Sequence, residues 1–511
     1  MNIRRFLRHL LSRNAVTVFL LILQLAFLAI AVSAIGERFY IVYLALILLD
    51  VVLVVYLMNK NEPSAYKLAW IVTISIVPLF GGVVYLYVKQ TQQLPKAMEA
   101  HYQKHTRELL VQDEATLKEL DELCPDHSNL AKYVSRYGLY PVYRNRLAKY
   151  YPLGEIQFEA MLSEMDKAEK FIFMEYFIIS EGYMLDRISE LLIRKSKAGI
   201  DVRIMFDGIG TGLRSSSLPI RELEKNGIKC CVFNPFTPFL SSVQNNRDHR
   251  KIIVIDGNTA FNGGTNLADE YINRRERFGH WKDTAVMIKG EAVWNYTVMF
   301  LQLWDAQHNA QVSHREYLPD ISAFQELPED GFVQPFSDSP LDNEPVGKLA
   351  YMELINNAKE YVNITTPYLI LDEEMTNVLC FAAKKGVDVR VITPHIPDKW
   401  YVYMIAWNNY PRLISSGVKV YEYTPGFIHA KGCIADGKAA MIGTINFDYR
   451  SFYLHFESAA ILYQSAAIGE MKRDFDETVR ISHQITLNEC NDRPFLKKVS
   501  GDLLNMFAPL L

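Results

Sequence analysis

The sequence lacks several features that mark common protein classes. Its six cysteines, among 511 residues, include no Cys-x-x-C pair, so no zinc-binding spacing is present. The formal net charge is −4, whereas proteins that bind nucleic acid usually carry a basic excess. We therefore expect no metal ion, no other cofactor and no nucleic-acid partner, and the sequence leaves the protein partners unknown.

Charged residues are also scarce in the N-terminal region, which contains three long apolar segments. These segments are residues 15–35, 39–58 and 68–88. A bilayer-spanning helix needs about 20 apolar residues, and the first two segments reach that length. The first is too long for a signal peptide, and a second follows at once. We therefore predict that residues 1–92 form a transmembrane region of two or three spans in a multi-pass protein of the cell membrane.

The third apolar segment decides on which side of the membrane the rest of the chain lies. Four arginines precede the first segment, which favours a cytoplasmic N-terminus. If residues 68–88 span the bilayer, the rest of the chain is on the outer side. If they form a re-entrant helix, broken at Pro78 and the pair Gly81-Gly82, it stays in the cytoplasm. Asp50 is the one acid within residues 39–58, and it is either a functional charge or a cap on a helix contact.

The remainder of the chain repeats its own pattern once. Residues 93–138 are polar and helix-forming, and they indicate a connector. The apolar and β-branched runs that follow predict three strands in each half, at residues 170–179, 199–206 and 227–233 and again at residues 360–369, 386–391 and 417–420. Strands that alternate with helices are typical of an α/β sheet. We predict two tandem α/β domains, residues 139–313 and 346–511, joined by a linker over residues 314–345.

One motif occurs in both halves with the spacing His-x-Lys-x-x-x-x-Asp. The first copy is His249, Lys251 and Asp256, and the second, 180 residues later, is His429, Lys431 and Asp436. An asparagine follows each copy at the same distance, Asn266 and Asn446. With the glycine at 263 and 443, five positions match between the two copies, which is hard to obtain by chance. A lone His would more often be a core residue whose ring is already hydrogen-bonded.

The residue types in this motif suit chemistry at phosphorus. Residues two apart on a strand point to the same face, so His249 and Lys251 face one side together. A neutral imidazole can attack an electrophile or move a proton near pH 7, and a lysine can stabilise the charge on a phosphate oxygen. Two such sets facing each other provide one His to attack and one His to protonate the leaving oxygen. The lysines also disfavour a metal ion, because they would repel it.

The duplicated motif resembles that of the phospholipase D superfamily. The trailing Gly-Gly-Thr-Asn at residues 263–266 and the run Gly-Thr-Ile-Asn-Phe-Asp-Tyr-Arg-Ser at residues 443–451 also resemble it. With the hydrophobic N-terminus, the chain is similar to bacterial cardiolipin synthases. The resemblance covers roughly residues 130–511. It implies two phospholipase D-like domains about a pseudo-two-fold axis, with one active site between them.

The resemblance also implies roles for the motif residues. His249 becomes the nucleophile, which forms a phosphohistidine, and His429 the general acid. Lys251, Lys431, Asn266 and Asn446 bind the phosphate oxygens. Asp256 and Asp436 belong to the catalytic motif, but each precedes a Gly and falls at a turn, where an Asp side chain binds backbone amides. We expect these two to fix the loops.

The resemblance further implies an acid downstream of each motif that orients the His of the other half. The candidates are Asp283, in His280-Trp281-Lys282-Asp283, and Glu457, in His455-Phe456-Glu457. We predict that Glu457 pairs with His249 and that Asp283 pairs with His429. An ordinary carboxylate at a strand end is the alternative for each.

Four further stretches leave their function open. Glu175-Tyr176 and Pro367-Tyr368 end equivalent strands and could line a lipid pocket or pack in the core. Arg450 and Ser451 could hold phosphate, but Glu270 and Tyr271 take their places in the first half. The apolar C-terminus, residues 503–511, would more ordinarily dock on the protein than lie on a bilayer.

The resemblance implies a membrane-bound phosphatidyltransferase. It would make cardiolipin and glycerol from two phosphatidylglycerol molecules, with membrane lipids as its partners. The alternatives are a phospholipase D that releases phosphatidic acid, or a transferase that uses another alcohol. The catalytic residues do not separate these reactions, because the reactions differ only in the acceptor. A nuclease and a non-catalytic membrane scaffold are weaker alternatives, given the apolar N-terminus and two intact motifs.

Overall fold

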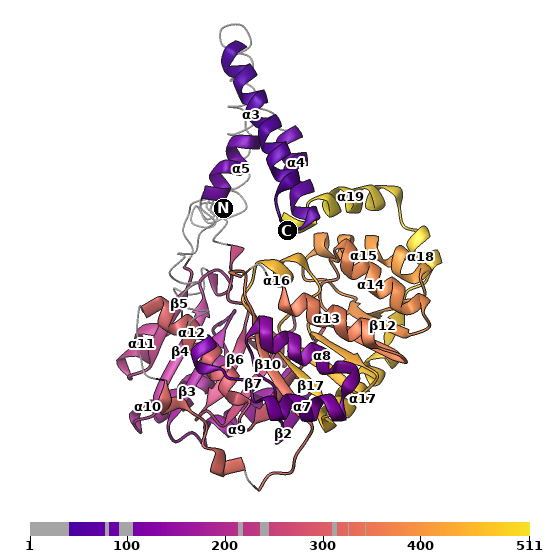
Figure 1. The fold of residues 1–511 in the computed structure, drawn as a ribbon. Helices are drawn as coiled ribbons and strands as arrows, with labels where there is room; N and C mark the ends of the chain where they lie inside the picture. The colour runs from indigo at the N-terminus through magenta and orange to yellow at the C-terminus, as the bar shows by residue number, and fades with distance from the viewer. Residues whose placement is uncertain are drawn as a thin grey trace. The chain divides into compact units, whose positions relative to one another are not determined.

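The computed structural model describes residues 40–76, 81–90, 106–212, 218–235, 245–308, 314–324, 326–342 and 344–510. The chain divides into two compact units, Met1–Thr91 and Gln92–Pro509. Figure 1 shows the helices of the first unit and the sheets of the second.

The N-terminal unit contains three described helices, α3 (Tyr40–Asn59), α4 (Ser64–Ile76) and α5 (Gly81–Gln90). Their small core includes Leu57 and Tyr85. Two helices, α4 and α5, therefore occupy the third predicted segment, in which Pro78 and the pair Gly81-Gly82 were expected to break a helix. The first predicted segment, residues 15–35, lies outside the described residues.

A search of the described residues finds no helix that is both long and apolar enough to cross a bilayer. The spans that the sequence predicts therefore stay predictions. Asp50 lies on α3 and is largely buried.

The larger unit contains two main sheets, as the repeat predicts. In the described part of the chain, the first sheet has the order β2 (Leu147–Tyr151), β9 (Ala285–Lys289), β7 (Thr259–Gly263), β6 (Lys251–Ile255), β3 (Phe171–Tyr176), β4 (Asp201–Asp207) and β5 (Lys229–Phe233). The second has the order β1 (Tyr143–Arg144), β10 (Phe332–Asp338), β17 (Glu457–Tyr463), β16 (Ala439–Gly443), β15 (Gly432–Ala435), β11 (Tyr361–Thr365), β12 (Asp388–Pro394), β13 (Lys419–Tyr423) and β18 (Ser482–Gln484).

The two sheets share one internal topology. In the first, β3, β4 and β5 are parallel and β6 runs antiparallel to β3. In the second, β11, β12 and β13 are parallel and β15 runs antiparallel to β11. The sequence therefore predicted the α/β class and the duplication correctly. The strand β10 lies within the predicted linker and is fully buried between β1 and β17.

Helices cover the sheets, and one of these helices lies in the core. The described helices of this unit are α7 (Glu114–Leu123), α8 (Pro125–Tyr133), α9 (Gly154–Met165), α10 (Tyr183–Lys197), α11 (Ile220–Lys225), α12 (Val293–His308), α13 (Val346–Asn357), α14 (Glu373–Lys384), α15 (Trp400–Ser415), α16 (Tyr449–Tyr453), α17 (Ala466–Arg480), α18 (Leu487–Asn491) and α19 (Phe495–Met506). Every residue of α12 from Val293 to Asp305 is buried. A helix that is buried on all sides belongs to the core, and α12 contacts strands of both sheets.

Candidate active site

Two short parallel pairings cross from one half to the other beside the two motif histidines. The strand β14 (Gly426–Ile428) pairs with β8 (His280–Lys282), and Asp248 pairs with Phe456 in the same sense. The backbone N–H of His429 donates to the carbonyl of Lys282 at 2.7 Å, and that of His249 donates to the carbonyl of Phe456 at 2.9 Å. Each motif His is therefore bonded to the residue just before the acid of the other half.

These pairings bring the two predicted acids against the two histidines. His249 Nδ1 lies 2.9 and 3.0 Å from the two carboxylate oxygens of Glu457. His429 Nδ1 lies 2.6 Å from Asp283 Oδ2. All four side chains are buried. This is the pairing that the sequence predicted, and a carboxylate at Nδ1 keeps the proton there and leaves Nε2 free for chemistry.

Burial and nearby positive charge keep both histidines neutral. The pKa of His249 is lowered well below its usual value by burial and then by Lys251 and Lys431. The pKa of His429 is lowered for the same reasons. A neutral imidazole is the form that can attack phosphorus. Burial also raises the pKa of Asp283 to about 7, so the Asp283–His429 pair can hold one additional proton near neutral pH.

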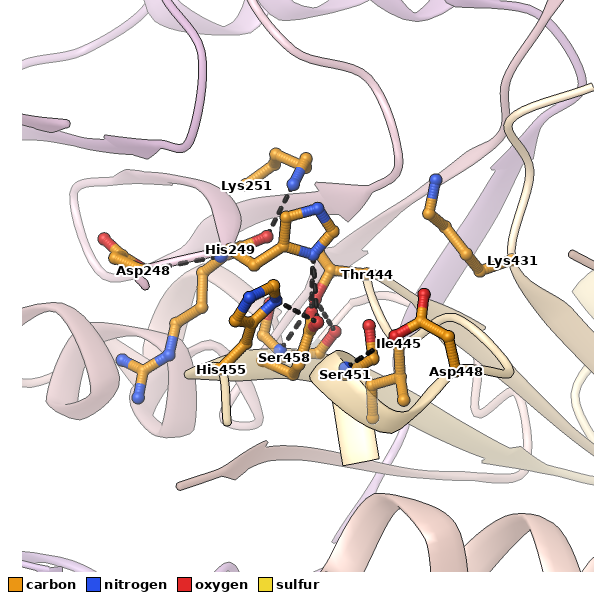
Figure 2. A network of polar contacts seen from close by, with 12 residues as sticks. Asp248, His249, Lys251, Lys431, Thr444, Ile445, Asp448, Ser451, His455 and Ser458 are labelled. Atoms are coloured by element: carbon orange, nitrogen blue, oxygen red, sulfur yellow. Dashed lines mark hydrogen bonds and ion pairs between the residues drawn. The ribbon is translucent and has the colours of Figure 1, made fainter. Parts of the chain in front are cut away.

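The two motif lysines lie next to the histidines. Lys251 Nζ donates to the carbonyl of His249 at 2.5 Å, and Lys431 Nζ donates to that of His429. Burial lowers the pKa of Lys251 to about 8 and that of Lys431 to about 7. In Figure 2 both amino groups lie on the side of the His249 ring away from Thr444 and Ser458. An anion there would receive two positive charges.

The two asparagines differ in what they bind. The amide of Asn266 accepts from the N–H of Ile178 at 3.0 Å and donates to the hydroxyl of Tyr271 at 2.7 Å. Asn446 Oδ1 is buried without a hydrogen-bond partner among the described residues. Asn266 therefore holds a strand end and a tyrosine in place, whereas Asn446 keeps bonding capacity for a ligand.

The motif aspartates lie away from the reacting groups. Asp256 accepts hydrogen bonds from the backbone amides of residues 169, 170 and 171, at 2.7 to 2.8 Å. Asp436 binds the amides of residues 359, 360 and 361 in the same way. Both have φ of 52°, in the left-handed region that Asp tolerates. Their assignment to the catalytic set is corrected on this point: they fix the loops that begin β3 and β11.

The two histidines have different neighbours. Tyr271, Trp281 and Phe427 pack around the ring of His429, with centroids 5.5, 5.6 and 5.8 Å away. Phe177 and His455 pack against His249, at 4.9 and 5.4 Å. His455 precedes Glu457 by two residues, just as Trp281 precedes Asp283. The two are therefore counterparts, one imidazole and one indole.

A buried ionic network lies beside His249 and has no counterpart beside His429. Arg250 is fully buried and its guanidinium lies 3.4 Å from Glu175. Arg247 pairs with Asp207 at 3.4 Å, and Asp207 also accepts from the N–H of Asp248 at 3.1 Å. The sheet registers place neutral residues at the matching second-half positions, which are Phe427, Ile428, Ala430, Thr365 and Pro394.

This network also decides between the two interpretations of the stretches that end equivalent strands. Glu175 and Tyr176 are core residues, because Glu175 pairs with Arg250 and both are fully covered. Pro367 and Tyr368 instead line a small cleft with Lys399 and Phe427. Lys399 lies near enough to lower the pKa of both motif histidines.

Ser451, which the sequence left open, lies beside the site together with Asp448. Asp448 caps α16 by accepting from the N–H of Ser451 at 2.8 Å. Ser451 is buried and lies near Asp448 in Figure 2. Its counterpart Tyr271 packs on His429 instead, so the difference between the halves reaches the catalytic ring.

One group of described side chains could hold a metal ion: His249, His455 and Glu457. Two imidazoles and a carboxylate are a common donor set for zinc. An ion there would compete for His249 Nδ1, the atom that Glu457 now binds. The sequence gave no sign of this group, because its members come from both halves.

Other residues of the site also escaped the sequence patterns. The hydroxyl of Thr444 donates to Glu457, and Trp281 and His455 flank the two acids. The alternation of side chains along a strand could have indicated Trp281 and His455, because each lies two residues before an acid and therefore shares its face. The buried Arg250 was not predictable, because a charged residue next to a motif is usually exposed.

The chain is similar in sequence to known proteins and to two family models. A family model described as "Cardiolipin synthase, PLD-like domain" matches residues 161–304 and 351–479, and a "Phospholipase_D-nuclease N-terminal" model matches residues 48–90. A cardiolipin synthase of Geobacillus kaustophilus is 33% identical over 88% of this chain and 90% of its own length. An uncharacterized protein of Streptococcus mutans is 45% identical over 90% and 99%.

The fold also resembles that of a solved structure. The phosphatidylserine synthase of Haemophilus influenzae superposes with a TM-score of 0.55 over 75% of this chain and 98% of its own. The two sequences are 13% identical, so this likeness concerns the fold alone.

Proposed function

This chain belongs to the family of phospholipase D-like cardiolipin synthases, and we propose that it joins two phosphatidylglycerol molecules at the membrane, making cardiolipin and releasing glycerol. As a phosphatidyltransferase, it moves a phosphatidyl group from one alcohol to another. The observation that carries the proposal is the pair of buried His–carboxylate dyads, one from each motif, accompanied by two lysines.

In the first step of the proposed reaction, His249 Nε2 attacks the phosphorus of one phosphatidylglycerol. A P–N bond forms and the bond from phosphorus to the glycerol oxygen breaks. His429 gives its proton to that oxygen, and glycerol leaves. Lys251 and Lys431 stabilise the charge on the non-bridging oxygens. The product is a phosphatidyl group held covalently on His249.

In the second step, His429 accepts a proton from the headgroup hydroxyl of a second phosphatidylglycerol. The hydroxyl oxygen attacks phosphorus, the P–N bond breaks, and cardiolipin forms. Covalent capture divides one displacement into two easier ones and retains the phosphatidyl group between alcohols. Both histidines return to their starting protonation states.

The different surroundings of the histidines support this division of roles. Asp283 has a pKa raised to about 7 by burial, so the Asp283–His429 pair can store the proton that the leaving glycerol needs. Glu457 faces His249 with both oxygens and also accepts from Thr444. These contacts hold the imidazole of His249 by Nδ1 and leave Nε2 to attack phosphorus, which suits a nucleophile.

Membrane attachment through the N-terminal unit is part of the proposal. The family match at residues 48–90 and the exposed apolar side chains of α3, such as Leu48 and Val52, support it. The division into residues 1–92, 93–138, 139–313, 314–345 and 346–511 likewise remains proposed.

A lipid assay tests the proposed reaction. Purified full-length protein is incubated with phosphatidylglycerol in detergent micelles without nucleotide, and the products are identified by mass spectrometry. We expect cardiolipin and glycerol in equal amounts. Phosphatidic acid as the main product would show that water is the acceptor, and a product with another headgroup would show that a different alcohol is used.

A further inference from the structure

The last helix of the chain, α19, has its apolar residues on the side that faces solvent. Five of its side chains are exposed: Phe495 (75%), Leu496 (78%), Val499 (37%), Leu503 (56%) and Met506 (43%). With 3.6 residues per turn, these five positions fall within an arc of about 100°. They therefore form one continuous apolar stripe.

The opposite side of α19 packs on the protein through small and polar groups. A Cβ atom at Gly501 would lie 2.5 Å from the side chain of Asn408 on α15, so any larger residue there would displace that side chain. Asn408 also donates to Asp502 at 2.9 Å. Figure 1 shows α19 alongside α15. An amphipathic helix of a globular protein normally buries its apolar stripe, and here the arrangement is reversed.

Apolar exposure continues on the helix that supports α19. Trp400, the first residue of α15, is 66% exposed. The preceding residue, Lys399, lines a small cleft with Tyr368 and Phe427, and Phe427 packs on the ring of His429. Trp is favoured where one end of a side chain is apolar and the other is wet. The pair α15 and α19 thus connects an exposed apolar surface with the active site.

Two lysines lie on α19 outside the stripe, Lys497 and Lys498, and Lys497 is exposed. Helices that lie in the interface of a membrane with anionic lipids carry an apolar stripe and have lysines on their polar face. Phosphatidylglycerol is anionic, so these lysines complement the charge of the proposed substrate.

We propose that α19, with Trp400, lies in the surface of an anionic phospholipid bilayer and brings the active site to its lipid substrate. The inference rests on the proposed function for the identity of that lipid. The C-terminal segment then both docks on the protein and lies on the bilayer, because α19 packs on α15 by one side and contacts lipid by the other. A second copy of the chain and the N-terminal helices are the competing occupants of the stripe.

Photolabelling of the full-length protein tests this contact. The protein is reconstituted in vesicles of phosphatidylglycerol and phosphatidylcholine that contain a phospholipid with a diazirine in its acyl chain. After irradiation, mass spectrometry locates the lipid adducts. We expect adducts on residues 495–506 and none on α9, where Ile156 is a lone exposed apolar residue. Labelling of the N-terminal helices without α19, or protein–protein crosslinks from α19, would overturn the proposal.

A double variant tests the consequence for the reaction. Leu496→Ser with Leu503→Ser should remove the adducts on α19 and raise the apparent KM for phosphatidylglycerol, as mole fraction in micelles, by roughly tenfold. The kcat should change by less than about twofold, because neither residue lies in the site. The matched control Ile156→Ser should change neither constant, and an unchanged KM in the double variant would contradict the proposal. Photolabelling needs no turnover, so labelled α19 in a protein that makes no cardiolipin would refute the proposed function alone.

Discussion

The two halves of the larger unit share one fold but differ in what surrounds their histidines. His249 is flanked by an imidazole and lies next to a buried network of arginines and carboxylates. His429 is enclosed by three aromatic rings, and neutral residues replace the network. The duplicated motif therefore supplies the same side chains to both halves, whereas the surroundings of each copy determine how it holds a proton.

The largest expected effect separates the roles of the two histidines. His249→Ala and His429→Ala should each lower kcat by about 10⁴-fold or more. Only His429→Ala should still form the covalent intermediate when the donor carries a leaving group that needs no proton, such as a nitrophenol ester of phosphatidic acid. Burst kinetics and intact-protein mass spectrometry would detect it. A burst in His249→Ala and none in His429→Ala would reverse the assignment.

The next effect concerns the buried network of the first half. Arg250→Ala leaves Glu175 without its partner in the core and should destabilise the protein by about 3–5 kcal/mol. Replacing Glu175, Asp248 and Arg250 together by the second-half residues Thr, Ile and Ala should cost less than the single change, because no charge remains unpaired. Denaturant unfolding measures both. A triple variant less stable than Arg250→Ala would mean that the network itself stabilises the fold.

The two orienting acids should differ in pH dependence more than in rate. Asp283→Asn and Glu457→Gln should each lower kcat by about 10²-fold. The pKa of Asp283 is raised to about 7, so the protonated Asp283–His429 pair is present below pH 7 and lost as pH rises through that value. Only Asp283→Asn should therefore remove a fall of kcat above pH 7. The pH dependence of kcat, measured for both variants and the wild type, tests this difference.

The two lysines predict a second fall at higher pH. Burial lowers the pKa of Lys431 to about 7 and that of Lys251 to about 8, so both are charged below these values and neutral above them. In the free enzyme kcat/KM should therefore fall about tenfold per pH unit between pH 7 and 8, and about a hundredfold per unit above pH 8, where both lysines lose their charge. Lys431→Arg keeps its charge and should make this fall shallower. An identical profile in the variant would exclude Lys431 as its cause.

The smallest effect comes from exchanging the flanking residue of the first half for that of the second. Burial lowers the pKa of His455 to about 3, so its imidazole is neutral at working pH, and its Nδ1 lies 3.7 Å from a carboxylate oxygen of Glu457, beyond hydrogen-bond distance. His455→Trp should therefore change kcat by less than about threefold. It should also relieve inhibition by added Zn²⁺, because one of three donors is lost. Equal zinc sensitivity in both proteins would show that ions act elsewhere.

Several features of the site could be predicted because they depend on short-range spacing. The His-x-Lys pairs, the paired strands and the turn role of Asp256 and Asp436 all follow from residues close in sequence. The pairing of Glu457 with His249 was expected from the resemblance, and the parallel bridge between Asp248 and Phe456 supplies its physical cause. The roles of His455, Trp281 and Arg250 were not expected, because they depend on contacts between segments that are far apart in the chain.

The sequence by itself determined the duplication, the α/β class, the candidate catalytic side chains and the apolar N-terminal region. Each of these features follows from the composition of a segment or from spacings of a few residues. Backbone geometry converts such spacings directly into strand faces and turns. Only the tertiary structure decided how the halves differ. Burial removes water from the site and makes each pKa depend on neighbours from other strands. The outward stripe of α19 was decided in the same way, by the packing of Gly501 on Asn408 rather than by the pattern of the helix.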